Sequence, residues 1–194
     1  MSTKSSILVL IMLLLTAAGH TQLAAENPMP GGITFLPVTY SQWQEKLAAY
    51  KGNILVVDLW ATWCAPCVQR FPHMVELSRK YSDRERIRFV SMSLDDRSDP
   101  AALELAHKFL IRQNATFDNY RMDEIIPDAF DKFNIQGIPA VFIYDRTGKL
   151  RYRLTGDDPN HQFTNEDVER AVKTLLLEGS RSPDQPLRSR HQGS

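Results

Sequence analysis

Residues 60–67 read Trp60-Ala61-Thr62-Trp63-Cys64-Ala65-Pro66-Cys67, and this stretch holds both cysteines of the chain. An apolar run at 54–60 leads into it, and a pattern typical of a helix follows at about 65–81. The start of a helix offers unpaired backbone N–H groups and the positive end of the peptide dipoles, and both favour a thiolate over a thiol. We therefore expect Cys64 to act as a nucleophile near neutral pH. Cys67 is expected to lie close enough to attack the mixed disulfide that forms.

A single acid, Asp58, interrupts the apolar run. The run lacks the alternation of a half-exposed strand, so the pattern at 53–59 predicts a strand that is buried on both faces. A carboxylate in such a strand is costly unless it is hydrogen-bonded or protonated. Either the pleat exposes Asp58 to solvent, or the acid is buried beneath the cysteines with a raised pKa. We expect the second arrangement, because perturbed acids gather at functional sites.

The other secondary structure elements follow from apolar periodicity and capping residues. Ser41 is expected to cap a helix to about residue 50, with Gln44 as the reciprocal cap. Asp99 and Thr164 are expected to cap helices that end near residues 112 and 177. The remaining predicted elements are strands at 33–36, 87–94, 115–122, 137–144 and 149–154, a short helix at 127–133 and a turn at 145–148. This order predicts an α/β fold with a central mixed β-sheet flanked by helices on both faces.

The length of 194 residues suggests one folded domain with extra segments at both ends. The predicted parts are a signal peptide or membrane anchor at 1–25, a linker or irregular lead-in at 26–37, a domain at 38–178 and a disordered tail at 179–194. The chain has 23 Lys and Arg residues against 23 Asp and Glu residues, and it has no long basic block. This balance argues against nucleic acid as a partner.

The N-terminal residues have the features of an export signal. Lys4 is the only early charge, and the apolar run at 7–18 suits a signal peptide and is short for a membrane span. Cleavage after Ala25 and cleavage after Gly19 both fit, and an uncleaved anchor stays open. No cysteine lies near the junction, which excludes a lipid-modified cysteine. We expect a periplasmic or other extracytoplasmic location, where disulfides persist.

The motifs around the cysteines resemble those of the thioredoxin superfamily, and most closely its exported, TlpA-like branch of the cytochrome c maturation type. The resemblance rests on residues 57–67, on Phe71-Pro72 and on Gly137-Ile138-Pro139, together with the element order over about 33–178. It implies a thioredoxin fold and a thiol-disulfide oxidoreductase that acts on protein disulfides. It also implies that the Ile138–Pro139 bond is cis and faces the disulfide.

The same resemblance implies a role for each site residue. Cys64 would attack, Cys67 would resolve, and Asp58 would move protons to and from the resolving thiol. Substrate would bind at Trp63, Ala65, Pro66, Ile138 and Pro139, and the backbone beside Pro139 would pair with an extended substrate strand. Apart from the redox-active cysteine pair we expect no cofactor. The expected partners are protein thiols and disulfides and a membrane or exported electron donor. The protein itself is expected to act mainly as a reductant of protein disulfides.

One position departs from the pattern of the exported branch. That branch often carries a glutamate three residues after the second cysteine, and here the position is Arg70. A guanidinium cannot accept a proton, but it can favour a nearby thiolate by charge attraction. Asp58 is then expected to be the only nearby carboxylate available for proton transfer.

Other classes of function fit the residues less well. A zinc site needs four ligands and the chain has two cysteines, while His73 is not a close neighbour of Cys67 on a helix face, so no metal is expected. His107 and His161 are read as ordinary surface or capping residues. A peroxidase stays open because Thr62 and Arg70 flank the cysteines. A thioredoxin-fold module that binds protein without catalysis also stays open.

Overall fold

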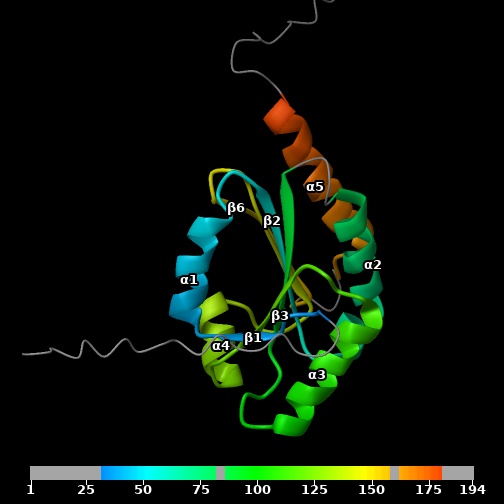
Figure 1. Ribbon diagram of the computed structural model, residues 1–194. Coiled ribbons are helices and arrows are strands. Elements are labelled where there is room, and N and C mark those ends of the chain that lie inside the picture. Colours follow the sequence, from blue (N-terminus) through cyan, green and yellow to red (C-terminus); the bar gives the residue numbers. More distant parts are fainter. Residues whose placement is uncertain (1–31, 82–85, 158–161, 181–194) are drawn as a thin grey trace, which may run out of the picture.

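The computed structural model describes residues 32–81, 86–157 and 162–180 (Figure 1). The predicted signal peptide or anchor and nearly all of the predicted tail lie outside these residues. The elements are β1 (Leu36–Val38), α1 (Tyr40–Ala49), β2 (Ile54–Trp60), α2 (Ala65–Tyr81), β3 (Ile87–Ser93), α3 (Pro100–Gln113), β4 (Asp118–Met122), α4 (Ile126–Phe133), β5 (Ala140–Tyr144), β6 (Leu150–Thr155) and α5 (Asn165–Ser180).

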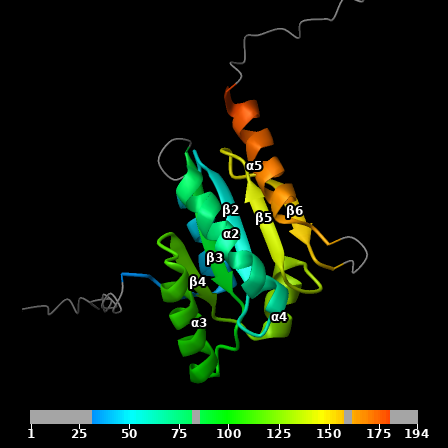
Figure 2. The ribbon, with the colours of Figure 1, turned by 90° about the vertical axis from the view of Figure 1, so that its right-hand side faces the viewer.

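The strands form one sheet in the order β1-β4-β3-β2-β5-β6. The pairs β1–β4, β4–β3 and β3–β2 are parallel, and β2–β5 and β5–β6 are antiparallel. Figure 1 shows α1 and α4 on one side of the sheet and α2, α3 and α5 on the other, and Figure 2 shows α2 crossing the face of the central strands. The predicted mixed sheet with helices on both faces is confirmed.

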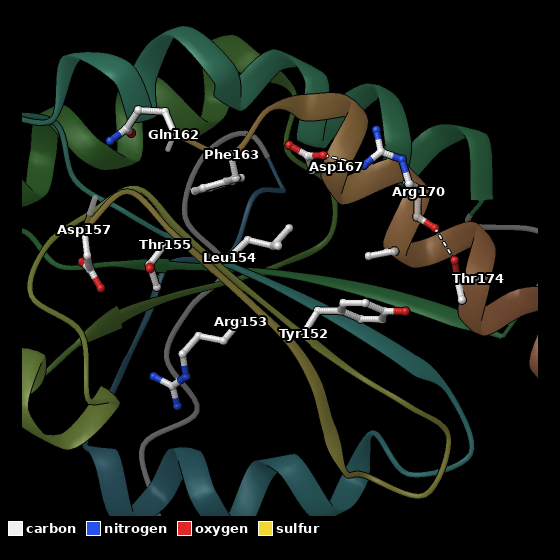
Figure 3. A pocket seen from close by; sticks show the side chains of 11 residues that line it. Tyr152, Arg153, Leu154, Thr155, Asp157, Gln162, Phe163, Asp167, Arg170 and Thr174 are labelled. Carbon is white, nitrogen blue, oxygen red and sulfur yellow. Dashed lines mark hydrogen bonds and ion pairs between the residues drawn. The ribbon is translucent and has the colours of Figure 1, made fainter. Parts of the chain in front are cut away.

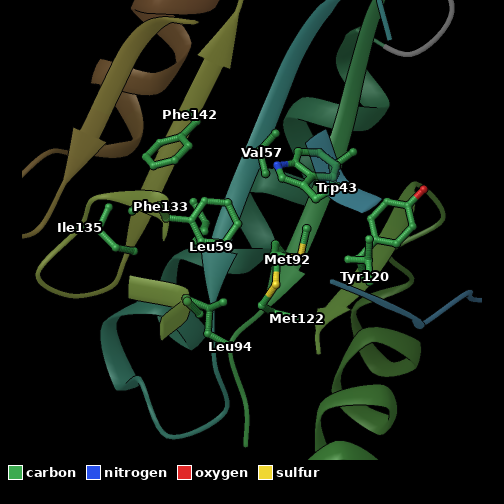
Figure 4. Close-up of a cluster of buried hydrophobic side chains, with 14 of the residues drawn as sticks. Trp43, Val57, Leu59, Met92, Leu94, Tyr120, Met122, Phe133, Ile135 and Phe142 are labelled. Carbon is green, nitrogen blue, oxygen red and sulfur yellow. The ribbon is translucent and has the colours of Figure 1, made fainter. Parts of the chain in front are cut away.

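β2 lies at the centre of the sheet, and its side chains alternate between the two layers. Its odd-numbered residues, 55, 57 and 59, pack with Trp43 of α1 and Phe133 of α4 (Figure 4). Ile54 and Val56 pack instead with side chains of α2 and α5. All seven β2 residues are buried, as the lack of polar–apolar alternation in this run predicts. Asp58 therefore lies in a covered layer, and β2 ends directly before the cysteine loop.

The start of α1 differs from the expectation. Thr39, and not Ser41, caps the helix: its hydroxyl accepts from the Gln42 N–H at 3.3 Å, and its own N–H donates to Gln42 Oε1 at 2.9 Å. Two overlapping capping boxes exist in the sequence, and the earlier one is used because β1 ends directly before it. The Tyr40 N–H then donates to Glu124 Oε1 at 3.0 Å.

The predicted position of the first strand, at 33–36, is wrong. β1 comes later, at Leu36–Val38, while Ile33 is buried in the cluster of side chains that contains both cysteines. The predicted domain boundary at residue 38 thus falls inside the sheet. Within the three described ranges, no helix has both the length and the apolar composition needed to cross a membrane.

Other local predictions are confirmed. Asp99 caps α3 by accepting from the N–H groups of Ala101 and Ala102 at 2.9 and 3.2 Å. Thr164 and Asp167 exchange hydrogen bonds at the start of α5. The turn between β5 and β6 closes on Gly148, whose φ of 85° suits glycine.

Candidate active site

The two cysteines form a disulfide at the start of α2, with their Cα atoms 5.3 Å apart. The Cys67 N–H donates to Cys64 Sγ at 3.3 Å, so an unpaired amide of the first helical turn points at the first sulfur. The predicted placement of Cys64 at a helix start is confirmed. Cys64 keeps 5% of its surface exposed and Cys67 keeps 1%, so Cys64 is the more accessible of the two.

A buried acid that the sequence reasoning missed, Asp95, holds the loop ahead of the cysteines. Its carboxylate accepts from the Thr62 backbone N–H at 3.0 Å and from the Thr62 hydroxyl at 2.5 Å. The Ser93 hydroxyl donates to its second oxygen at 2.8 Å. Residue 95 follows β3, which pairs with β2, so the ends of two adjacent parallel strands are tied together beneath the cysteine loop.

Asp58 is buried, as predicted, with 1% of its surface exposed. Burial raises its pKa from 3.8 to about 6, and the Arg70 guanidinium opposes this rise. Arg70 Nη1 lies 3.7 Å from Asp58 Oδ1. Arg70, the position that departs from the exported branch, thus supplies the counter-charge of the buried acid. The sequence alone predicts only an attraction between Arg70 and the thiolate.

Phe163 covers the other side of Arg70. The guanidinium carbon lies 4.2 Å from the centre of the Phe163 ring, the geometry of a cation–π contact. Figure 3 shows Phe163 directly ahead of α5. Nothing local in the sequence signals this contact, because Phe163 lies far along the chain from Arg70.

Three aromatic rings support the cysteine loop from below. Trp60, Phe71 and Phe109 are packed with ring centres 5.0 to 5.1 Å apart, in one cluster with both cysteines. Trp63 points away from this cluster and is 55% exposed, and Ala65 and Pro66 are also exposed. The predicted substrate-binding residues beside Cys64 therefore lie at the surface.

The Ile138–Pro139 bond is cis, as the resemblance implies. Ile138 is partly buried and packs against the cluster that contains Cys64 and Cys67. The Pro139 carbonyl accepts from the Gly156 N–H at 3.0 Å, which ties this loop to the end of β6. The structure thus brings the loop at 137–139 to the cysteine pair.

Comparison with known proteins agrees with this geometry. Residues 34–112 match the sequence profile of the thioredoxin family. The chain is similar to the thioredoxin family over these residues. The domain is similar to the thiol-disulfide oxidoreductase ResA of Geobacillus kaustophilus, with 24% identity over 132 residues that cover 68% of each chain. It is also similar to the thiol:disulfide interchange protein DsbE of Vibrio cholerae, with 27% identity over 132 residues, 66% of this chain and 64% of the relative.

Solved structures show the same fold. The crystal structure of a thiol:disulfide interchange protein of the thioredoxin family from Chlorobium tepidum superposes with a TM-score of 0.52 at 25% identity. The match covers 66% of this chain and 83% of that chain. The thioredoxin fold, predicted from the motifs around the cysteines, is confirmed.

A separate cavity of about 610 Å³ lies between β6 and α5 (Figure 3). Tyr152, Leu154, Phe163 and Arg170 are among its lining residues, and none of the predicted site residues lines it. In the part of the chain that the structure describes, no three His, Cys, Asp or Glu side chains are grouped as a metal ion would need. His107 contacts the Ile33 carbonyl at 3.0 Å, and His161 lies outside the described residues.

Proposed function

We propose that this protein is an exported thiol-disulfide oxidoreductase that exchanges its Cys64–Cys67 pair with the disulfides of other proteins, mainly as a reductant. The observation that carries the proposal is the disulfide at the start of α2, with the Cys67 amide donating to Cys64 Sγ. A helix start stabilises the thiolate that thiol exchange requires. The names of the relatives, thiol-disulfide oxidoreductase and thiol:disulfide interchange protein, support the same reaction.

The reaction transfers two electrons from the reduced pair to a substrate disulfide. The Cys64 thiolate attacks one substrate sulfur, forms a mixed disulfide and expels the other substrate sulfur as a thiolate, which takes a proton from solvent. Cys67 then gives its proton to the Asp58 carboxylate and attacks Cys64 Sγ. This step forms the Cys64–Cys67 disulfide and releases the second substrate thiolate. That thiolate also takes a proton from solvent, so the substrate leaves as a dithiol, and Asp58 later returns its proton to solvent.

Substrate recognition is proposed to take place on the exposed face around Cys64. Trp63, Ala65 and Pro66 are exposed there, and the loop with Ile138 and Pro139 packs against the same cluster of side chains. An extended substrate strand would lie beside this loop and pair with its main chain. Such pairing reads backbone more than side chains, which suits protein substrates.

The compartment and electron donor extend the proposal. The apolar run at 7–18 supports export, with residues 1–25 as a cleaved signal peptide or as an anchor. A reductant in an oxidising compartment needs a supply of electrons, so we propose a membrane or exported donor of reduced thiols. Maturation of c-type cytochromes, which the resemblance suggests, is a process that would use such a reductant.

The proposal is tested by trapping the mixed disulfide. Cys67→Ser keeps the attacking thiol and removes the resolving one, so the variant is expected to accumulate a covalent complex with partner proteins through Cys64. The complex should be seen on non-reducing gels and disappear with dithiothreitol. The matched control, Cys64→Ser, should trap little or nothing.

Absence of any trapped complex, together with a Cys64–Cys67 pair that is inert to dithiol reagents, would favour a binding module without catalysis. The reduction potential decides direction. A value near about −270 mV supports a reductant, while one near about −120 mV supports an oxidant.

A further inference from the structure

We propose that Arg70 is a positioning residue for this reaction: it holds the Asp58 carboxylate charged and in place beneath the cysteine pair. The inference rests on the proposed function, in which Asp58 accepts the proton of Cys67. It gives a role to a residue of α2 that is not among the predicted catalytic or substrate-binding residues.

The spacing along α2 places Arg70 on the same helix face as Cys67, and its side chain contacts Asp58. Cys67 and Arg70 are three residues apart in one helix, and residues at this spacing share a face. The guanidinium of Arg70 reaches Asp58 Oδ1 at 3.7 Å. The side chains of Arg70 and Asp58 are 14% and 2% exposed, so the ion pair is largely shielded from water.

No other charged group in the described structure acts on Asp58. Its neighbours in the sheet are Ser91 of β3 and Val141 of β5, and the Ser91 hydroxyl donates to Asn119 at 2.8 Å instead. From α5, the apolar side chains of Val168 and Val172 pack on this face. Among the described residues, Asp58 Oδ1 and Arg70 Nη1 have no hydrogen-bond partner, and the two atoms face each other at 3.7 Å as an ion pair.

Phe163 fixes the orientation of the guanidinium. The Arg70 guanidinium carbon lies 4.2 Å from the centre of the Phe163 ring, so the planar group contacts both the aromatic ring and the carboxylate. A planar, delocalised cation suits such a stacked place, while a lysine ammonium is compact and more strongly hydrated. Arg70→Lys would therefore keep the charge and lose part of the geometry.

The consequence concerns the charge of Asp58 at neutral pH. A buried carboxylate without a counter-charge takes up a proton, because leaving water disfavours its ionised form. A protonated Asp58 cannot accept the proton of Cys67. With Arg70 beside it, the acid is free to ionise and to take up this proton during the resolving step.

The test compares Arg70→Gln and Arg70→Lys with wild type in two measurements. One is the titration of the Asp58 side-chain carboxyl by ¹³C NMR in the oxidised protein, which needs no enzymatic activity. The other is the pH profile of the resolving step, followed as release of a thiol from a preformed mixed disulfide on Cys64. Arg170→Gln, which removes an exposed arginine paired with Asp167, is the matched control.

We expect Arg70→Gln to move the Asp58 titration and the resolving-step profile upward by about one pH unit or more. At pH 7 a shift of one unit lowers the ionised fraction of Asp58 from about nine-tenths to about one half, so the resolving step should slow by about twofold or more. Arg70→Lys should show a smaller shift, and Arg170→Gln none. If Arg70→Gln does not fold, Phe163→Leu replaces it and should give a smaller shift in the same direction.

Unchanged titration of Asp58 in Arg70→Gln, or in Phe163→Leu where that variant is used, would overturn the role of Arg70. This outcome is separate from failure of the proposed function, which the Cys67→Ser trapping experiment decides in a protein with an intact Arg70.

Discussion

At the scale of single residues, the Asp58 carboxyl connects the site to the stability of the domain. It lies in the central strand, and its pKa is raised from 3.8 to about 6 by burial, against the opposing effect of Arg70. A carboxyl whose pKa is higher in the folded than in the unfolded chain contributes stability below its unfolded pKa. That contribution is lost as the pH rises through the folded pKa.

We predict that this pH dependence disappears in Asp58→Asn. The difference in unfolding free energy between wild type and variant should fall by about 3 kcal/mol as the pH rises from about 3 to about 7, because a shift of about two units corresponds to this energy. Urea denaturation at several pH values measures it. Acids with lowered pKa, such as Glu169, are present in both proteins, so their pH-dependent contributions to the unfolding free energy cancel in the difference. Parallel stability curves for the two proteins would contradict the prediction.

Residues whose role follows from adjacent sequence could be predicted. Cys64, Cys67 and Asp58 belong to one strand–loop–helix segment, so their placement follows from the apolar run and the helix start. The contact between Phe163 and Arg70 could not be predicted, since it depends on how the segment before α5 packs on α2. For Arg70 the sequence predicts an attraction for the thiolate, and the structure shows an ion pair with Asp58.

At the scale of elements, the end of β3 organises the cysteine loop through Asp95. This acid accepts hydrogen bonds from the Thr62 N–H, the Thr62 hydroxyl and the Ser93 hydroxyl. The Trp60 carbonyl also accepts from the Leu94 N–H at 2.7 Å. The loop is therefore held by an adjacent strand end as well as by its own helix.

Asp95→Ala is predicted to lower the unfolding free energy by roughly 3 kcal/mol, because it leaves the buried donors of Thr62 and Ser93 without an acceptor. The Thr62 amide should also exchange its hydrogen faster in the variant. The matched control is Asp96→Ala: that acid is exposed, and its loss should lower the unfolding free energy clearly less. Equal effects of the two substitutions would show that Asp95 does not hold the loop.

Element types were easier to predict than element ends. The caps at Asp99 and Thr164 were predicted because each is a single clear signal before an apolar helix. The start of α1 was not, because Thr39 and Ser41 each have a glutamine three residues later, and tertiary packing selects between them. Asp95 was missed for a related reason: an acid after a strand looks like any turn residue until its partner loop is known.

At the scale of the whole molecule, the disulfide lies on a rigid aromatic support. Trp60 from β2, Phe71 from α2 and Phe109 from α3 meet in the cluster that contains both cysteines. Trp60 and Phe71 are fully buried. Each ring comes from a different element, so the cluster fixes how α2 and α3 lie on the sheet.

Phe71→Ala is predicted to lower the unfolding free energy by about 3 to 5 kcal/mol, the usual cost of removing a buried aromatic ring. Denaturant unfolding of the oxidised protein gives the value. Phe35→Ala is the control, because Phe35 is only partly buried and stacks on His107, and it should cost clearly less. A loss below about 1 kcal/mol for Phe71→Ala would show that the cluster repacks around the missing ring and does not fix the position of α2.

The overall architecture could be predicted, and the sheet order could not be derived from periodicity. Alternating strands and helices followed by a hairpin indicate a mixed sheet. The order β1-β4-β3-β2-β5-β6 depends on pairings between strands that are distant in the chain, and local patterns carry no record of them.

The pairing of β1 with β4 affects how the chain folds. Leu36 is paired with Tyr120, although the two residues are far apart in the sequence and are therefore synthesised at different times. Contacts of such long sequence separation slow folding, because a long loop must close before they form. During synthesis β1 emerges first among the strands, and it has no place in the sheet until β2, β3 and β4 have followed it.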